Sequence, residues 1–412
     1  MRIRAGVAAT LVVVALIVTG CSGSSDTSSP TTTLHGTTTS KSGTSTASAA
    51  TPVNFTSGDF YAVPKTLPKG PHGTLIRYQE VSPAVIKGAT TYRVMYTSTS
   101  MEGEPIAVTG TVLVPDAKAP TGGRPLLTIA HGTTGIADAC APSKDPGGEL
   151  SLLREPIDRG WLVAETDYEG LGTPGRHPYL VGESEGRSTL DAIVAAGQLP
   201  NADPSDQLAI AGYSQGGHGA LWANQMAPEV TPELHVVGTF AGAPATEMQV
   251  ILRAAPGGFK ALMVAGYAAA YPNLDPATFF TPAALAQLGS VDTGCTRDVF
   301  KAMASVPGDQ LTRPDAFDGP WAAVADANDP GRVKTADPIL IIHSQQDDTV
   351  PVTLSKFLLE RMCKSGQVVE RRVLPNGGGH VAAASVAYPQ AIAWLVGRFA
   401  EKPTQPVNSC TS

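Results

Sequence analysis

Charged residues are scarce in this chain: Asp, Glu, Lys and Arg make up 16% of its 412 residues, and no basic cluster occurs among them. The formal net charge of −7 and the lack of a basic cluster argue against a nucleic-acid partner. Hydrophobic residues reach 42%, and Gly and Pro are abundant. A chain of this length and composition can bury a large α/β core.

Metal-ligand spacing is also missing. None of the eight histidines lies at a metal-binding spacing from another His or from a Cys. We therefore expect neither a metal nor a cofactor. The chain has no propeller-like repeats and no acidic or basic pocket motif, which argues against a serine peptidase.

The first residues have the features of an export signal. Residues 1–4 are basic, and the apolar run 5–17 is short for a membrane span. The sequence Val-Thr-Gly-Cys that ends at Cys21 matches a bacterial lipobox, which is cleaved before a cysteine that carries lipid. We therefore expect a signal peptide over residues 1–20 and lipidation of Cys21. The alternative is a plain secretory signal with an incidental cysteine.

The segment 22–56 is rich in Ser and Thr and has no hydrophobic periodicity, which predicts a disordered tether. A globular domain is then expected over residues 57–412. We expect an exported protein that is anchored by lipid at Cys21 to the outer face of the cytoplasmic membrane, or secreted. The sequence does not predict its oligomeric state.

Short apolar segments alternate with helical stretches in the globular part. Three of them are expected to pair antiparallel at a sheet edge: 75–81, 91–98 and 106–114. Six more, separated by helical stretches, predict a mostly parallel sheet with helices on both faces; they span 126–130, 162–167, 207–212, 236–241, 338–343 and 368–374. A closing helix is expected over residues 385–400.

The run Gly212-Tyr213-Ser214-Gln215-Gly216 has the pattern Gly-x-Ser-x-Gly between a predicted strand and a predicted helix. In such a turn the serine takes a strained backbone conformation, and side chains two positions away would clash. Ser214 is therefore the candidate nucleophile, with a helix N-terminus behind it that favours negative charge. The alternative is a strand-to-helix turn without chemistry.

A catalytic serine needs a base and an orienting acid, which follow it along the chain in this kind of turn. The acid is expected after the strand 338–343, where Asp347 and Asp348 compete. The common hydrolase phrase His-Gly-x-x-Asp-x-x-Val-Pro favours Asp347, so that Asp348 points to solvent or caps the following helix. His380 is the expected base, because it follows the last strand and a glycine-rich loop. His343 is expected to be a core residue.

The strand 126–130 leads into the loop His131-Gly132-Thr133-Thr134-Gly135. A His-Gly loop at this place builds half of an oxyanion hole. The backbone N–H of Thr133 or Thr134, together with that of Gln215, is expected to hold the oxyanion. We expect His131 to brace the loop rather than to transfer protons.

The segment from about 243 to 335 is longer than a normal crossover and contains alanine-rich helical stretches. It is inserted between the strands near 241 and 338, on the edge that carries the candidate nucleophile. This placement predicts a helical cap whose apolar side chains line an acyl-chain pocket. The alternative is that these side chains only pack the cap onto the core.

Four cysteines follow Cys21: Cys140, Cys295, Cys363 and Cys410. An even number in an exported chain predicts two disulfides, for which three pairings exist. We favour Cys140–Cys295 and Cys363–Cys410, and the second bond would pin the irregular C-terminal tail. The alternative is four buried thiols.

Several phrases together resemble the secretory lipase family of α/β-hydrolases, which includes the A-type lipase of a Candida yeast and exported actinobacterial proteins. The phrases are Ala130-His-Gly-Thr-Thr-Gly, Cys140-Ala-Pro-Ser, Asp167-Tyr-Glu-Gly-Leu-Gly and Gly212-Tyr-Ser-Gln-Gly-Gly, and the similarity covers residues 60–410. The resemblance implies an α/β-hydrolase fold with a helical cap and no cofactor. It also implies Ser214 as nucleophile, Asp347 as acid and His380 as base, and it supports the Cys140–Cys295 bond.

The sequence therefore predicts a serine carboxylic-ester hydrolase, a lipase or an esterase, that cleaves acyl esters through an acyl-enzyme on Ser214. The expected partner is a small-molecule or lipid ester. Two alternatives stay open. One is an acyltransferase that uses acceptor alcohols of the cell envelope, and the other is a non-catalytic, lipid-anchored binding protein on a hydrolase scaffold.

Overall fold

Residues 51–400 and 402–411 are described in the computed structural model of the protein. The expected signal peptide, the lipidation site Cys21 and most of the expected tether lie outside the described residues. The end of the tether differs from the prediction, because Val53 and Asn54 already pair with a strand of the sheet. Within the described part of the chain, no helix is long and apolar enough to cross a membrane.

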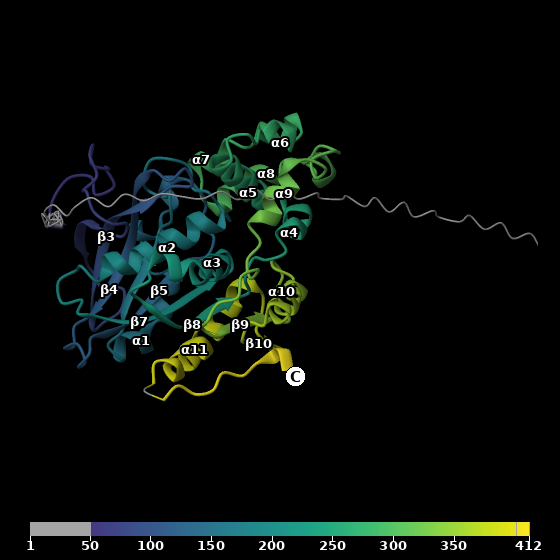
Figure 1. The fold of residues 1–412 in the computed structure, drawn as a ribbon. Coiled ribbons are helices and arrows are strands. Elements are labelled where there is room, and N and C mark those ends of the chain that lie inside the picture. The colour runs from purple at the N-terminus through teal and green to yellow at the C-terminus, as the bar shows by residue number, and fades with distance from the viewer. Residues whose placement is uncertain (1–50, 401, 412) are drawn as a thin grey trace, which may run out of the picture. The chain divides into compact units, whose positions relative to one another are not determined.

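One sheet organises the described residues, with the strand order β1-β2-β3-β4-β6-β5-β7-β8-β9-β10 (Figure 1). The pairs β2–β3, β3–β4 and β4–β6 are antiparallel, and the strands from β6 to β10 pair in parallel. The strands are β1 (Val53–Asn54), β2 (Leu75–Val81), β3 (Ala89–Thr99), β4 (Pro105–Pro115), β5 (Arg124–Ala130), β6 (Leu162–Thr166), β7 (Pro204–Tyr213), β8 (His235–Gly242), β9 (Ile339–Ser344) and β10 (Val369–Leu374). The predicted mostly parallel sheet and its antiparallel edge are confirmed.

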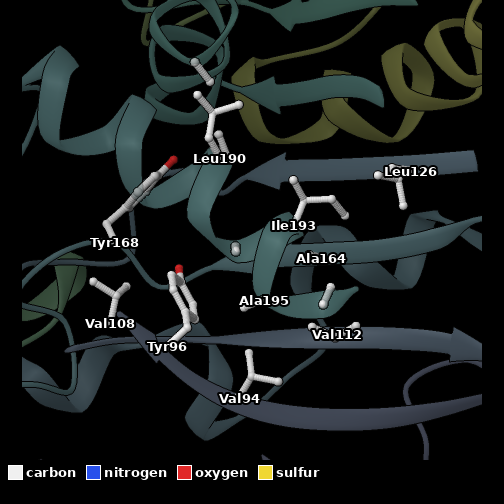
Figure 2. Close-up of a cluster of buried hydrophobic side chains, with 14 of the residues drawn as sticks. Val94, Tyr96, Val108, Val112, Leu126, Ala164, Tyr168, Leu190, Ile193 and Ala195 are labelled. Carbon is white, nitrogen blue, oxygen red and sulfur yellow. The ribbon is translucent and has the colours of Figure 1, made fainter. Parts of the chain in front are cut away.

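Helices cover both faces of the sheet. Successive side chains of a strand point to opposite faces, so neighbouring residues pack against different helices. Leu126 of β5 packs in one cluster with Ile193 of α2 (Figure 2), whereas Leu127 belongs to the opposite cluster with Leu395 of α11. The helices are α1 (Arg154–Asp158), α2 (Gly182–Ala196), α3 (Gln215–Val230), α4 (Met248–Ala254), α5 (Gly257–Ala270), α6 (Pro282–Leu285), α7 (Ser290–Thr293), α8 (Thr296–Met303), α9 (Pro320–Ala327), α10 (Val352–Ser365) and α11 (His380–Arg398). Double-sided burial explains why the central strands are continuously apolar.

The helices α4 to α9 all lie between β8 and β9, inside the segment that the sequence marks as an insertion. They share a hydrophobic cluster that includes Leu262 and Met263 of α5, Phe279, Phe280 and Trp321. Figure 1 shows α5 to α9 gathered together. The inserted helices therefore share an apolar core, to which Ile136, Tyr179 and Leu180 from outside the insertion also belong.

Two disulfides join the cysteines in the pairs favoured from the sequence. Cys140, at the end of the short 3₁₀ helix η1 (Asp138–Cys140), is bonded to Cys295, the residue before α8. This bond links the loop region after β5 to the inserted helices. Cys363 of α10 is bonded to Cys410 of η6 (Ser409–Thr411), which fastens the C-terminal segment to the domain.

The predicted start of the closing helix is wrong: α11 begins at His380, five residues earlier than expected. Asp348 supplies the missing start signal, because its Oδ1 accepts the backbone N–H of His380 at 3.1 Å. A carboxylate at this position satisfies a free N–H group and interacts favourably with the helix dipole. His380 is therefore the first residue of a helix and not part of a loose loop.

Candidate active site

Ser214 forms the turn between β7 and α3 in a backbone conformation that few non-glycine residues adopt. Its φ is 60° and its ψ is −120°. Two hydrogen bonds hold this conformation: the Ser214 N–H donates to the Gly242 carbonyl at 2.9 Å, and the Ser214 carbonyl accepts the Ala245 N–H at 3.2 Å. The neighbouring strand β8 and the residues after it thus maintain the strained turn.

The two glycines that flank Ser214 are required by close backbone contacts. A Cβ atom on Gly212 would lie 2.1 Å from the Gly216 carbonyl oxygen, and one on Gly216 would lie 1.8 Å from the Ala130 carbonyl oxygen. No side chain fits at these distances. The glycines therefore let the start of α3 approach the end of β5, where the predicted oxyanion loop begins.

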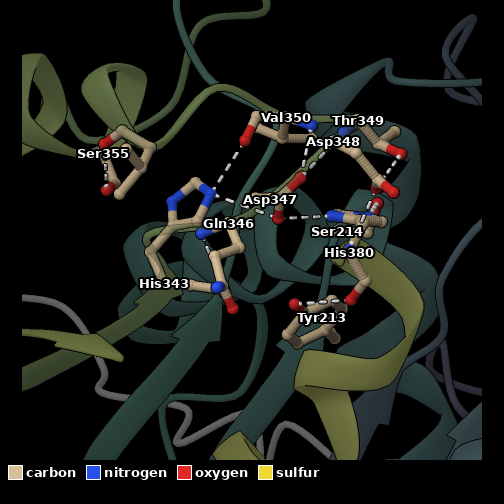
Figure 3. A network of polar contacts seen from close by, with 12 residues as sticks. Tyr213, Ser214, His343, Gln346, Asp347, Asp348, Thr349, Val350, Ser355 and His380 are labelled. Atoms are coloured by element: carbon tan, nitrogen blue, oxygen red, sulfur yellow. Dashed lines mark hydrogen bonds and ion pairs between the residues drawn. The ribbon is translucent and has the colours of Figure 1, made fainter. Parts of the chain in front are cut away.

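Ser214, His380 and Asp347 form a continuous chain of polar contacts (Figure 3). His380 Nε2 lies 2.8 Å from Ser214 Oγ, and His380 Nδ1 lies 2.7 Å from Asp347 Oδ2. Because an ionised carboxylate can only accept, Nδ1–H donates to Asp347 and Nε2 is left to accept the serine proton. The sequence predicts the same three residues, with Ser214 as nucleophile, His380 as base and Asp347 as acid.

The adjacent carboxylates Asp347 and Asp348 have different contacts. Asp347 Oδ1 accepts the backbone N–H groups of Thr349 and Val350, at 2.9 and 2.7 Å, while its Oδ2 faces His380. Burial raises the pKa of Asp347, but the hydrogen bonds from His343 and His380 outweigh it and hold the pKa well below its usual value. Asp348 instead accepts the backbone N–H of His380 and so caps α11. The sequence offered a capping role for Asp348, but on the helix that follows it, α10.

His343 contacts the proposed acid Asp347, which the sequence did not predict. It is buried, as expected of a core residue, but its Nε2 lies 3.3 Å from Asp347 Oδ2 and 2.9 Å from the Val350 carbonyl oxygen. Asp347 is thus held between two imidazole rings (Figure 3). His343 lies near the end of β9 and Asp347 in the turn directly after it, so their closeness in sequence was the available signal for this contact.

The predicted oxyanion loop lies beside the nucleophile. Thr133 and Thr134 line one cavity together with Ser214 and His380. The Thr133 hydroxyl is 2.7 Å from the Tyr179 hydroxyl, which ties the loop to the segment before α2. The loop therefore borders the space in which an oxyanion on Ser214 would form.

His131, at the base of this loop, has the contacts of a bracing residue. Its Nδ1 lies 2.6 Å from the Gly132 carbonyl oxygen, and its ring packs on Tyr168 with centroids 4.4 Å apart. Burial lowers the pKa of His131 to about 4, so the ring is neutral at physiological pH and Nδ1–H donates.

A buried polar network behind the nucleophile was missed from the sequence. The Gln215 side chain donates to Glu185 Oε1 at 2.8 Å and to His177 Nε2 at 2.9 Å. Glu185 Oε2 contacts His218 Nδ1 at 2.6 Å, and His218 Nε2 contacts the Asn328 carbonyl oxygen at 2.8 Å. The network joins α2, the start of α3 and the end of the inserted segment, and so fixes the residue after the nucleophile.

Glu149 is a second missed residue. It lies in the 3₁₀ helix η3 (Gly148–Leu152) and borders the same cavity as Ser214. Its Oε1 accepts the Gly132 N–H at 2.8 Å, and its Oε2 accepts the Tyr388 hydroxyl. Burial raises the pKa of Glu149 to about 7, although these two hydrogen bonds and the electrostatic effect of the nearby His380 ring lower it.

Ser214 lies between two cavities. One, of about 310 Å³, is mostly apolar and is lined by side chains of α4, α5, the loop before α10 and α10 itself, including Val250, Ile251, Phe259, Met263, Val350 and Leu354. The other, of about 590 Å³, carries the oxyanion loop, Glu149 and His380. Within the described residues, no group of three or more His, Cys, Asp and Glu side chains is placed to hold a metal ion.

The sheet, the strained serine turn and the order serine, acid, histidine define an α/β-hydrolase. Residues 146–406 match the family model described as Secretory lipase, and the chain belongs to this family. Among solved structures, it resembles Candida antarctica lipase A in its closed state, with a TM-score of 0.69 and 20% identity over 82% of this chain and 84% of that one. It also resembles the rice cell wall degrading esterase LipA of Xanthomonas oryzae, with a TM-score of 0.65, 20% identity and coverage of 78% and 95%.

Two proteins with similar sequences each match most of the chain. A protein of Mycobacterium tuberculosis described as a probable inactive lipase is 28% identical over 84% of this chain and 82% of its own length. Lipase A of Arthroderma benhamiae is 25% identical, with coverage of 84% and 80%.

The contact at Gly216 generates a test of the serine turn. Gly216→Ala should destabilise the protein by about 1–3 kcal/mol or more, although alanine is the better helix former, because its Cβ would overlap the Ala130 carbonyl oxygen. Gly289→Ala is the matched control, since nothing lies within 4 Å of its Cβ position. Urea unfolding of both variants measures the difference, and equal midpoints would show that the close contact is not real.

Proposed function

We propose that the protein hydrolyses carboxylic esters through an acyl-enzyme on Ser214. The observation that carries the proposal is the unbroken chain from Ser214 Oγ to His380 and Asp347, with contacts of 2.8 and 2.7 Å, beside a mostly apolar cavity. A serine hydroxyl becomes a nucleophile when a base takes its proton and a third group orients the base.

The proposed reaction has two halves. His380 Nε2 takes the proton as Ser214 Oγ attacks the ester carbonyl, and Asp347 stabilises the resulting imidazolium. The backbone N–H of Gln215, with that of Thr133 or Thr134, holds the oxyanion. His380 then gives its proton to the leaving alcohol, and a water molecule activated by His380 releases the acid from Ser214.

The apolar cavity supports a hydrophobic acyl group as the part of the substrate that lies beside Ser214. Most of its lining residues are apolar and come from the inserted helices, and its few polar residues include Asp348 and Thr349 of the loop after β9. One relative carries the description of a probable inactive lipase. In the present chain the three side chains of the proposed triad are within hydrogen-bond distance, which supports activity.

Ser214→Ala should abolish ester hydrolysis, with a loss of about 10⁵–10⁶ in kcat, while the protein stays folded. The matched control is Ser305→Ala, because Ser305 is exposed and, within the described residues, its hydroxyl bonds only to the Ala302 carbonyl oxygen near the end of α8. Hydrolysis of p-nitrophenyl esters from acetate to palmitate measures both variants, and the preferred chain length distinguishes an esterase from a lipase. Wild-type turnover in Ser214→Ala would rule out the proposed nucleophile.

The neighbouring aspartates provide a matched pair. Asp347→Asn should lower kcat about 10⁴-fold, because the amide cannot orient His380 in the required tautomer or stabilise its charge. Asp348→Asn should stay within about fivefold of wild type, since an amide oxygen can still accept the His380 N–H. The kcat values of the two variants decide between the residues, and a larger loss in Asp348→Asn would reverse the assignment.

We further propose that the signal peptide spans residues 1–20 and that Cys21 carries lipid, on the lipobox pattern alone. Expressed in a bacterial host that processes lipoproteins, the protein should incorporate labelled palmitate and sediment with membranes. Cys21→Ser should remove both properties. Unlabelled wild-type protein in the medium would instead support a plain secretory signal.

A further inference from the structure

Glu149 connects the two parts of the site that must keep a fixed distance during the reaction. Its Oε1 accepts the N–H of Gly132, in the loop that leads to Thr133 and Thr134. Its Oε2 accepts the hydroxyl of Tyr388, which lies on α11, the helix that begins with His380. A single side chain thus joins the predicted oxyanion loop to the helix of the proposed base.

The contact with the loop is close. A Cβ atom on Gly132 would lie 3.0 Å from Glu149 Oε1 and 3.4 Å from the Tyr213 carbonyl oxygen. Gly132 therefore lies between the Glu149 carboxyl group and the backbone just before the nucleophile. Any shift of Glu149 would move the peptide groups whose N–H bonds are expected to face the oxyanion.

The other end of the bridge is equally well fixed. Tyr388 is buried, packs edge-to-face on Phe240 of β8 with ring centroids 5.4 Å apart, and is eight residues from His380 on the same helix. The backbone of α11 joins the two residues over about two turns, although Pro389, next to Tyr388, lacks the N–H that would bond the Ser385 carbonyl. Holding Tyr388 therefore helps to hold His380.

The carboxyl group itself borders the cavity of Ser214 and His380, yet it makes no hydrogen bond to either residue. Its two oxygens are taken by Gly132 and Tyr388, and the electrostatic effect of the nearby His380 ring lowers its raised pKa. Glu149 thus lies beside the site, and in the described part of the chain its side chain bonds only to Gly132 and Tyr388.

We propose that Glu149 is a positioning residue, which sets the oxyanion loop against the helix that carries His380. This inference depends on the proposed ester hydrolysis. A bridge of this kind should act on the transition state, where the oxyanion forms, and hardly on ground-state binding.

The test compares Glu149→Gln, Glu149→Leu, Tyr388→Phe and the double variant Glu149→Leu/Tyr388→Phe, with p-nitrophenyl butyrate as substrate. Glutamine can accept from Gly132 and donate to the Tyr388 oxygen, so it should keep kcat within about fivefold of wild type. Glu149→Leu should lower kcat about 10²-fold with KM within about threefold, the loss typical of a displaced oxyanion donor. As a single variant, Tyr388→Phe should lower kcat. In the double variant it should cause no further loss beyond that of Glu149→Leu.

Glu155→Leu is the control, because Glu155 is exposed on α1 and its side chain pairs, among the residues that the structure describes, only with Arg159. Thermal unfolding verifies that each variant is folded; if Glu149→Leu is not, the Gln and Phe variants carry the test. The proposal is overturned if Glu149→Leu or Tyr388→Phe keeps wild-type kcat, or if only KM changes. It is also overturned if Glu149→Gln loses as much kcat as Glu149→Leu. Ser214→Ala is assayed alongside: activity in that variant refutes the proposed function, whereas a dead Ser214→Ala with an unaffected Glu149→Leu refutes only the role of Glu149.

Discussion

The carbonyl oxygen of Ala130 leaves no room for a side chain at residue 216, and the geometry of the site depends on that contact. Because residue 216 has no side chain, the first turn of α3 packs directly against the end of β5. Ser214 then has a φ of 60° beside the loop that follows β5. The strained serine is therefore a consequence of packing between two elements and not of a local preference. Gly212, Gly216 and the bonds from β8 maintain it together.

The rest of the proposed triad is brought in by the parallel sheet and by two adjacent carboxylates. Parallel strands have their carboxyl ends at one edge, so Ser214 after β7, Asp347 after β9 and His380 after β10 meet there. Asp347 bonds the ring of His380, while Asp348 bonds its backbone N–H. The base is thus held at two points by one turn, which explains how a residue that follows a run of glycines has a defined position.

The sequence predicted those features that depend on local pattern. Apolar runs covered on both faces identified the strands, and the spacing around Ser214, Asp347 and His380 identified the residues that the structure brings into contact. It did not predict the start of α11, because the capping carboxylate comes from Asp348, more than thirty residues earlier in the chain. Glu149 and Glu185 were missed for the same reason: nothing near them in sequence shows that their partners are Gly132 and Gln215.

The most direct test of the central claim is covalent labelling with a fluorophosphonate, followed by mass spectrometry of the modified peptide. The phosphorus atom forms a bond to the serine oxygen and fluoride leaves, so the probe reports an activated hydroxyl without the need for a known substrate. The account predicts one adduct, on Ser214, with labelling at least about a thousandfold slower in His380→Ala. A folded wild-type protein that is not labelled, or a His380→Ala variant labelled as fast as wild type, would contradict it.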